Sequence, residues 1–239
     1  MSRPATPLHP PVAHATGRFR LPVVLVLMAA LSSILTTVWL ANSRGSVFAG
    51  VVFGVAIASG LTIFKALPNP FGALVLIFTS AFAYVVSYVT SFFTQVALSG
   101  FGLLTKAEES NMGSPGSASP ITLIAGGLVG GFLLGAAFLF VATPQNGSCR
   151  KLRRALVWSL WSAGLAAVGW ALSPLLGPIL SPFVHGVRPG EAWLTVNFRI
   201  PGGTIGMISS VHFVWQTGMA LAMALAAQKS LGSSRKKLL

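Results

Sequence analysis

Six long apolar stretches constrain what this chain can fold into more than any other feature. They cover residues 21–41, 46–66, 71–94, 121–143, 155–176 and 205–227, and the segments between them hold nearly every charge. A helix of about 20 residues is long enough to cross a hydrocarbon core of about 30 Å. The pattern therefore predicts an all-α integral membrane protein, built as a six-helix transmembrane bundle.

The composition excludes a soluble globule, because only 8% of the 239 residues are charged, against roughly 25% in an average soluble domain. The formal net charge of +13 would in a soluble protein suggest a nucleic-acid partner. Here the basic residues flank the apolar spans and are not interleaved with stacking aromatics. We therefore expect the lipid bilayer, and no nucleic acid, as the partner.

The basic residues also predict an orientation. If the N-terminus is cytoplasmic, twelve of the sixteen Lys and Arg residues fall on the cytoplasmic side, and all three Glu residues fall outside. The positive-inside rule then predicts that both termini lie in the cytoplasm, with the protein in the plasma (inner) membrane. Residues 1–20 are expected to form a disordered basic arm and residues 228–239 a basic cytoplasmic tail.

Two basic clusters, Arg150–Arg154 and Arg235–Lys237, lie next to predicted membrane boundaries. Such clusters attract anionic lipid headgroups, although they can also act as topology determinants alone.

Local patterns predict the connections. Residues 42–45 and 67–70 are so short that the helices they join should be antiparallel neighbours. Pro174, Pro178 and Pro182 oppose regular helix and predict a broken or re-entrant segment after the fifth span. Residues 192–200 alternate apolar and polar side chains, as in a half-buried strand or a short hairpin.

The fourth span is rich in glycines that are spaced four residues apart in three overlapping pairs. Glycines let helix backbones approach closely in lipid, so this helix should be central to the bundle or to a homo-oligomer or another membrane partner. A pore-lining role is the alternative. The glycines are Gly126, Gly127, Gly130, Gly131 and Gly135.

Two polar faces form a candidate substrate route. The third span carries Ser80, Tyr84, Ser87, Tyr88 and Ser91, and the sixth carries Ser209, His212 and Gln216. Counted from the outer ends, His212 lies level with Ser87, and Gln216 lies level with Tyr84, so the two helices should be in contact. The alternative is that these side chains only hold helices together by hydrogen bonds.

The chain offers little for catalysis or metal binding. It contains no Asp, its three Glu residues lie in predicted loops, and its one cysteine, Cys149, cannot form an intramolecular disulfide. No metal or other cofactor is expected, and an enzyme is disfavoured. The sequence favours a small transporter or permease subunit with a polar route between the third and sixth helices. The alternative is a non-catalytic membrane scaffold or assembly subunit that packs partners through the glycine-rich fourth helix.

Overall fold

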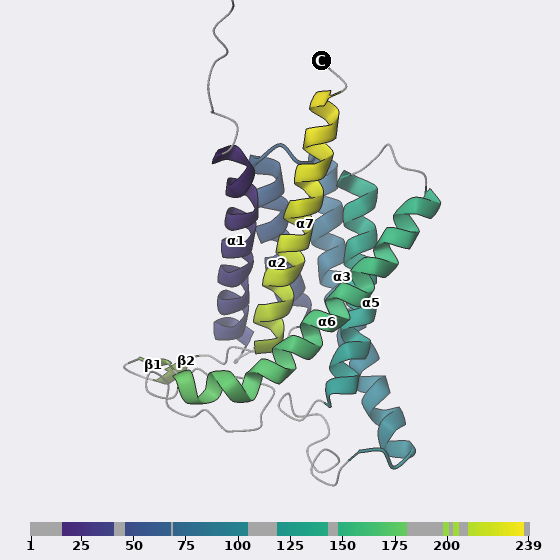
Figure 1. Cartoon of the computed structure of the whole chain (residues 1–239). Coiled ribbons are helices and arrows are strands. Elements are labelled where there is room, and N and C mark those ends of the chain that lie inside the picture. Colours follow the sequence, from purple (N-terminus) through teal and green to yellow (C-terminus); the bar gives the residue numbers. More distant parts are fainter. Residues whose placement is uncertain are drawn as a thin grey trace, which may run out of the picture.

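The computed structural model describes the backbone of residues 16–40, 46–67, 69–104, 119–142, 148–180, 198–200, 203–205 and 210–236. Side chains are described for most of these residues, namely 20–36, 48–67, 69–104, 119–142, 149–172 and 211–229. Within these ranges the chain forms helices and one short hairpin (Figure 1). The elements are α1 (Thr16–Leu40), α2 (Ser46–Ile63), α3 (Pro70–Gly100), α5 (Pro120–Ala142), α6 (Ser148–Leu180), β1 (Phe198–Ile200), β2 (Gly203–Ile205) and α7 (Ser210–Lys236).

The helices pack side by side in a closed ring. α1 packs against α2 and α2 against α3, as their short connections predict. α3 then packs against α5, α5 against α6, and α6 against α7. α7 returns to α1, so the first and last helices of the chain are neighbours (Figure 1). The core inside the ring contains large side chains that are fully buried, including Phe53, Phe138, Met219 and Met223.

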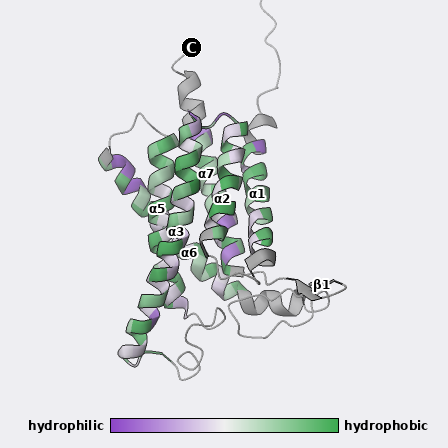
Figure 2. Cartoon of the chain, turned by 180° about the vertical axis from the view of Figure 1, so that it is seen from behind, coloured by the Kyte–Doolittle hydropathy of each residue, from purple (hydrophilic) through white to green (hydrophobic). Residues whose placement is uncertain are grey.

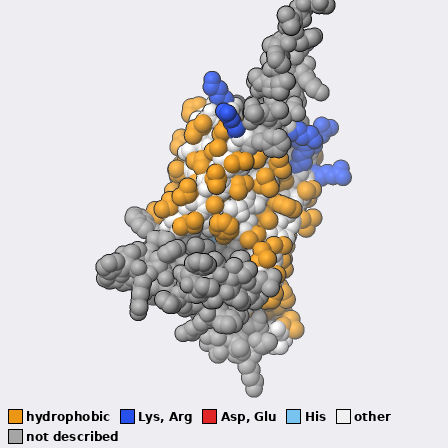
Figure 3. Space-filling view, turned by 60° about the vertical axis from the view of Figure 1, so that its left-hand side comes forward, with side chains coloured by type: hydrophobic (Ala, Val, Ile, Leu, Met, Phe, Trp, Pro, Cys, Tyr) orange, Lys and Arg blue, Asp and Glu red, His pale blue; other side chains and the backbone are white. Residues whose placement is uncertain are grey.

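The outer surface identifies the chain as a helical membrane protein. α3, α5 and residues 149–172 of α6 are long and apolar enough to cross a membrane, and α1 and α2 contain shorter apolar segments. Large apolar side chains point outward, among them Leu31 (58% exposed), Phe78 (72%) and Leu160 (68%). A water-soluble protein rarely exposes so continuous an apolar surface. Figure 2 shows apolar residues along the helices, and Figure 3 shows them covering the middle of one face.

The helices end at different residues from the apolar stretches. α1 begins at Thr16, inside the segment expected to be disordered, and α3 continues to Gly100. α7 continues to Lys236, through most of the expected tail. Hydropathy marks the depth of the hydrocarbon core, whereas a helix can continue into the headgroup region as long as its backbone bonds are satisfied. Residues 1–15 of the expected arm lie outside the described residues.

The start of α3 has a clear local cause. The side chain of Asn69 accepts a hydrogen bond from the backbone N–H of Gly72 (2.8 Å). Pro70 occupies the first helical position, where its missing N–H costs nothing and its fixed φ angle suits a helix. The short connection after α2 therefore ends in a well-capped helix.

The predicted break after the fifth span is wrong as far as the described residues extend, because α6 runs from Ser148 through Pro174 and Pro178 to Leu180. A spacing of four residues places both prolines on one side of the helix, so the lost backbone bonds fall on that side only. Such prolines are tolerated in membrane helices when neighbouring groups satisfy the freed carbonyls.

A short hairpin precedes α7, as the alternating pattern predicted. β1 pairs antiparallel with β2, with Arg199 opposite Thr204. Ile205, which was expected to begin the sixth span, belongs to β2 instead, and α7 begins at Ser210. The earlier part of the alternating pattern, residues 192–197, lies outside the described residues.

Candidate functional site

The five glycines of the fourth predicted span lie on two faces of α5. A Cβ atom on Gly126 or Gly130 would meet Ser87 of α3, and Gly126 also faces Ser91. A Cβ atom on Gly127 or Gly131 would meet Ser162 of α6, and one on Gly135 would meet Trp158 of α6. The glycine pairs therefore serve two separate contacts, one with α3 and one with α6, and both neighbours belong to the same chain.

This close approach allows α6 to form hydrogen bonds directly to the backbone of α5. The hydroxyl of Ser162 donates to the carbonyl oxygen of Gly127 (2.6 Å), and that of Ser159 donates to the carbonyl oxygen of Leu128 (2.5 Å). On the opposite side, the hydroxyl of Ser91 donates to the carbonyl oxygen of Thr122 (2.9 Å). Helix carbonyls are within reach of a neighbour's short side chain only where the two axes are close.

A second pair of closely packed glycines, Gly50 and Gly54 of α2, was not predicted from the sequence. A Cβ atom on Gly50 of α2 would lie 2.6 Å from the Cα atom of Ala81 in α3, and one on Gly54 would lie 2.8 Å from the Cα atom of Ile77. The signal was present, since the two residues are four apart in an apolar span. They make the α2–α3 contact another place where backbones touch.

The most polar part of the bundle interior is centred on Gln216 of α7. Its side-chain oxygen accepts a hydrogen bond from the hydroxyl of Ser32 in α1 (2.7 Å). Its side-chain nitrogen donates to the hydroxyl of Tyr84 in α3 (2.5 Å). Gln216 is fully buried, and the ring of His212 lies 5.8 Å from that of Tyr84 between centroids. We call Ser32, Tyr84, His212 and Gln216 the Gln216 cluster.

Aromatic rings surround this cluster. The ring of Trp215 lies edge-on to Tyr84 at 5.3 Å, and Phe53 of α2 lies 5.8 Å from Trp215 and 6.4 Å from Tyr84. The indole N–H of Trp215 donates to the hydroxyl of Ser162 (2.5 Å), which itself bonds to α5. Side chains of α1, α2, α3, α6 and α7 thus meet around one polar centre.

Only part of the predicted route faces that centre. Tyr84, His212 and Gln216 come together there, whereas Ser80 is buried against Gly54 of α2. Ser87 faces α5 and donates to the backbone oxygen of Ala83 (2.6 Å), rather than meeting His212 as its depth suggested. Tyr88 is 61% exposed on the outside. It lies about 80° around the helix from Ser80, at the edge of the predicted face. Ser209 lies outside the described residues.

Ser32 was missing from the predicted site. It lies with Ser33 in the middle of an apolar span, and both side chains are buried. A buried serine pair is a weak signal on its own, because a hydroxyl can bond to the backbone of its own helix. Its partner, Gln216, is 184 residues away in the chain.

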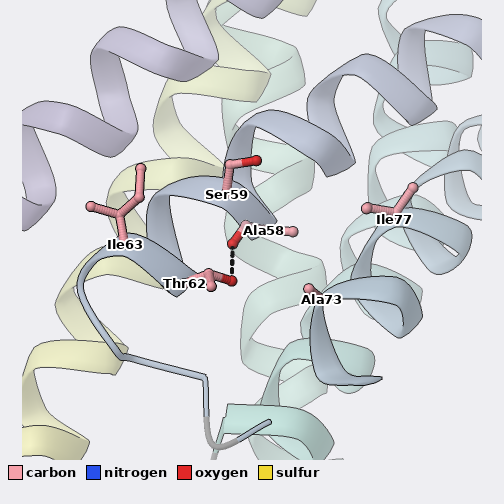
Figure 4. A pocket seen from close by; sticks show the side chains of 6 residues that line it. All are labelled: Ala58, Ser59, Thr62, Ile63, Ala73 and Ile77. Carbon is pink, nitrogen blue, oxygen red and sulfur yellow. Dashed lines mark hydrogen bonds between the residues drawn. The ribbon is translucent and has the colours of Figure 1, made fainter. Parts of the chain in front are cut away.

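A separate groove of about 370 Å³ lies between α2 and α3 on the outside of the bundle (Figure 4). Its lining is mostly apolar, and the hydroxyl of Thr62 donates to the backbone oxygen of Ala58 (2.7 Å). The only other side-chain hydroxyl in the lining is that of Ser59, so the groove offers few polar groups. Among the residues that the structure describes, no group of three or more His, Cys, Asp or Glu side chains could hold a metal ion.

Comparisons with protein families, characterised proteins and solved structures gave no significant match. The indication of function therefore comes from the chemistry of the Gln216 cluster. Its hydroxyl, amide and imidazole groups can donate and accept hydrogen bonds, and none of them is an acid or a permanent cation.

Proposed function

We propose that the chain crosses the plasma membrane six times with both termini in the cytoplasm. The seven basic residues whose side chains the structure describes support this topology, because they occur where α1 and α6 begin and where α2 and α7 end. These helix ends lie together at one end of the bundle (Figures 1 and 3). The positive-inside rule favours that end as the cytoplasmic one. The residues are Arg20, Lys65, Arg150, Lys151, Arg153, Arg154 and Lys229.

We further propose that the protein is a small transporter or permease subunit and that the Gln216 cluster is part of its solute route. The observation that carries this proposal is the hydrogen-bonded chain Ser32–Gln216–Tyr84, which joins three helices inside the bundle. Polar side chains are costly within a membrane and are commonly found at substrate pathways. Because Gln216 is fully buried, this arrangement corresponds to a closed route.

The alternative, a scaffold that packs partners through the glycine-rich helix, receives less support. Each of the five glycines of α5 faces α3 or α6 of the same chain. These glycines therefore leave no open face for a partner helix, and a scaffold would need another surface.

The test compares the solutes accumulated by a gene-deletion strain with those of strains complemented by variants. We expect the deletion to change the accumulation of at least one solute, and the wild-type gene to restore it. Gln216→Leu should fail to restore it, because it removes both interhelical hydrogen bonds at nearly constant volume. Thr217→Val is the matched control, since its hydroxyl donates to the backbone oxygen of Phe213 in its own helix (2.6 Å).

Protein abundance must be equal in the two complemented strains. Full restoration by Gln216→Leu would contradict a route through this cluster. An unchanged solute profile in the deletion strain, with loss of another membrane complex, would favour the scaffold.

A further inference from the structure

The first two turns of α6 carry a cluster of positive charge that is divided between two sides of the helix. Arg150, Arg153 and Arg154 are exposed, and their spacing of three and four residues places them on one outer face. Lys151 turns inward instead. It is 6% exposed, and its amino group lies 4.8 Å from the centre of the Phe140 ring in α5. The inner cation therefore has a partner in the protein, a cation–π contact.

The same outer face becomes apolar immediately below the arginines. Val157 is 61% exposed, Leu160 68% and Trp161 49%, while a Cβ atom on Gly164 would meet nothing within 4 Å. Figure 2 shows this change from hydrophilic to hydrophobic along the first part of α6. Arg153 and Leu160 are about 10 Å apart along the helix axis. That distance separates a phosphate at the membrane surface from the upper part of an acyl chain.

No acid neutralises the three arginines within the described part of the chain. The first turn of α6 has none, and Glu108, Glu109 and Glu191 all lie outside the described residues. Arginine binds phosphate oxygens with paired N–H donors, more specifically than lysine does. The face thus combines phosphate-binding side chains at headgroup depth with an open apolar surface at acyl-chain depth.

We propose that this outer face of α6 is a binding site for an anionic phospholipid. Arg150, Arg153 and Arg154 bind the phosphate, and the acyl chains lie along Val157, Leu160 and Trp161. The site is on the outside of the bundle and does not depend on the transport proposal.

The test is lipid binding to the purified full-length protein, measured by native mass spectrometry with dioleoylphosphatidylglycerol and dioleoylphosphatidylcholine. We expect tighter binding of phosphatidylglycerol. The double variant Arg153→Gln/Arg154→Gln should weaken that binding by about 25-fold, at about fivefold per basic residue removed. Its binding of phosphatidylcholine should stay unchanged.

The matched control is Arg20→Gln/Lys229→Gln, which removes the same charge from the same end of the bundle on α1 and α7. It should change phosphatidylglycerol binding by less than about twofold, since these residues lie on other helices. An equal loss in both double variants would replace the site by a diffuse effect of net charge. Equal affinity of the wild-type protein for the two lipids would also overturn the proposal.

Discussion

At the scale of single residues, the serine and threonine hydroxyls of the helices divide into two kinds that the sequence cannot distinguish. Ser87, Thr62 and Thr94 bond to the backbone of their own helix. Ser32 and Ser162 bond to other helices. Only the second kind should link the helices energetically, because a hydroxyl bonded to its own helix keeps that bond when the helices separate.

Ser162 provides the sharpest test of this difference, because its hydroxyl both donates to the carbonyl oxygen of Gly127 and accepts from the indole N–H of Trp215. Ser162→Ala leaves the buried indole N–H without this partner and should lower the free energy of unfolding by about 1–2 kcal/mol. Ser87→Ala is the control and should change it by less than about 0.5 kcal/mol. Unfolding in detergent micelles measures both values. A similar loss for the two variants would show that the interhelical bonds contribute nothing special.

In the predicted polar route, the depth of a side chain could be predicted from the sequence, but its contact partner could not. Counting along the helices placed Gln216 level with Tyr84, and these two side chains are hydrogen-bonded in the structure. The same count placed Ser87 level with His212, but Ser87 faces α5. The depth of a side chain in the membrane follows from the rise per residue of its own helix, so it can be counted along the sequence. Which neighbour a side chain meets depends on how each helix is rotated, and that is set by packing across the whole bundle.

At the scale of elements, glycines determine which helices touch through their backbones. The glycine-rich pattern of α5 could be recognised in the sequence, but its division between α3 and α6 could not, because the order of helices in the ring is not a local property. Likewise, the prolines of α6 predicted a break that α6 does not have before Leu180. The backbone bonds that prolines remove in a membrane helix can be replaced by its neighbours.

Adding a methyl group at these contacts should separate the helices. Gly50→Ala and Gly131→Ala should each destabilise the protein by about 1–3 kcal/mol, because the new Cβ atom meets backbone or tightly held side-chain atoms. A Cβ atom on Gly50 would meet the Cα atom of Ala81 and the carbonyl oxygen of Ser80. One on Gly131 would meet the side chain of Ser162 and the carbonyl oxygen of Trp158. Thermal unfolding in detergent gives the size of the effect.

Gly164→Ala is the control, since nothing lies within 4 Å of its new Cβ atom. It should be neutral or stabilising by up to about 1 kcal/mol, the usual gain from replacing glycine in a helix. If Gly50→Ala and Gly131→Ala were also neutral, close backbone contact would not be needed for stability.

At the scale of the whole molecule, the lengths of the helices follow from the sequence, whereas their arrangement in a closed ring does not. The sequence alone predicted six membrane-length segments, because each is a continuous apolar run. The closure of the ring by contact between α1 and α7 could not be predicted, because it joins the two ends of the chain. That closure places Ser32 beside Gln216, so the candidate site depends on a contact with the largest possible separation in helix order.

The proposed topology can be tested with single cysteines and an impermeant thiol reagent on intact cells. Cysteines introduced at residues 5 and 235, in a Cys149→Ser background, should remain unlabelled until the cells are opened, because the basic end of the bundle should face the cytoplasm. Cys149 is exposed at the beginning of α6, at that same end, so the wild-type protein should behave in the same way. Ser114→Cys is the positive control, since residue 114 follows the third span and should lie outside.

Labelling at residue 5 or 235 in intact cells would show that the basic residues do not orient this protein. If residue 114 were labelled as well, the number of spans between it and the labelled terminus would have to be even rather than three.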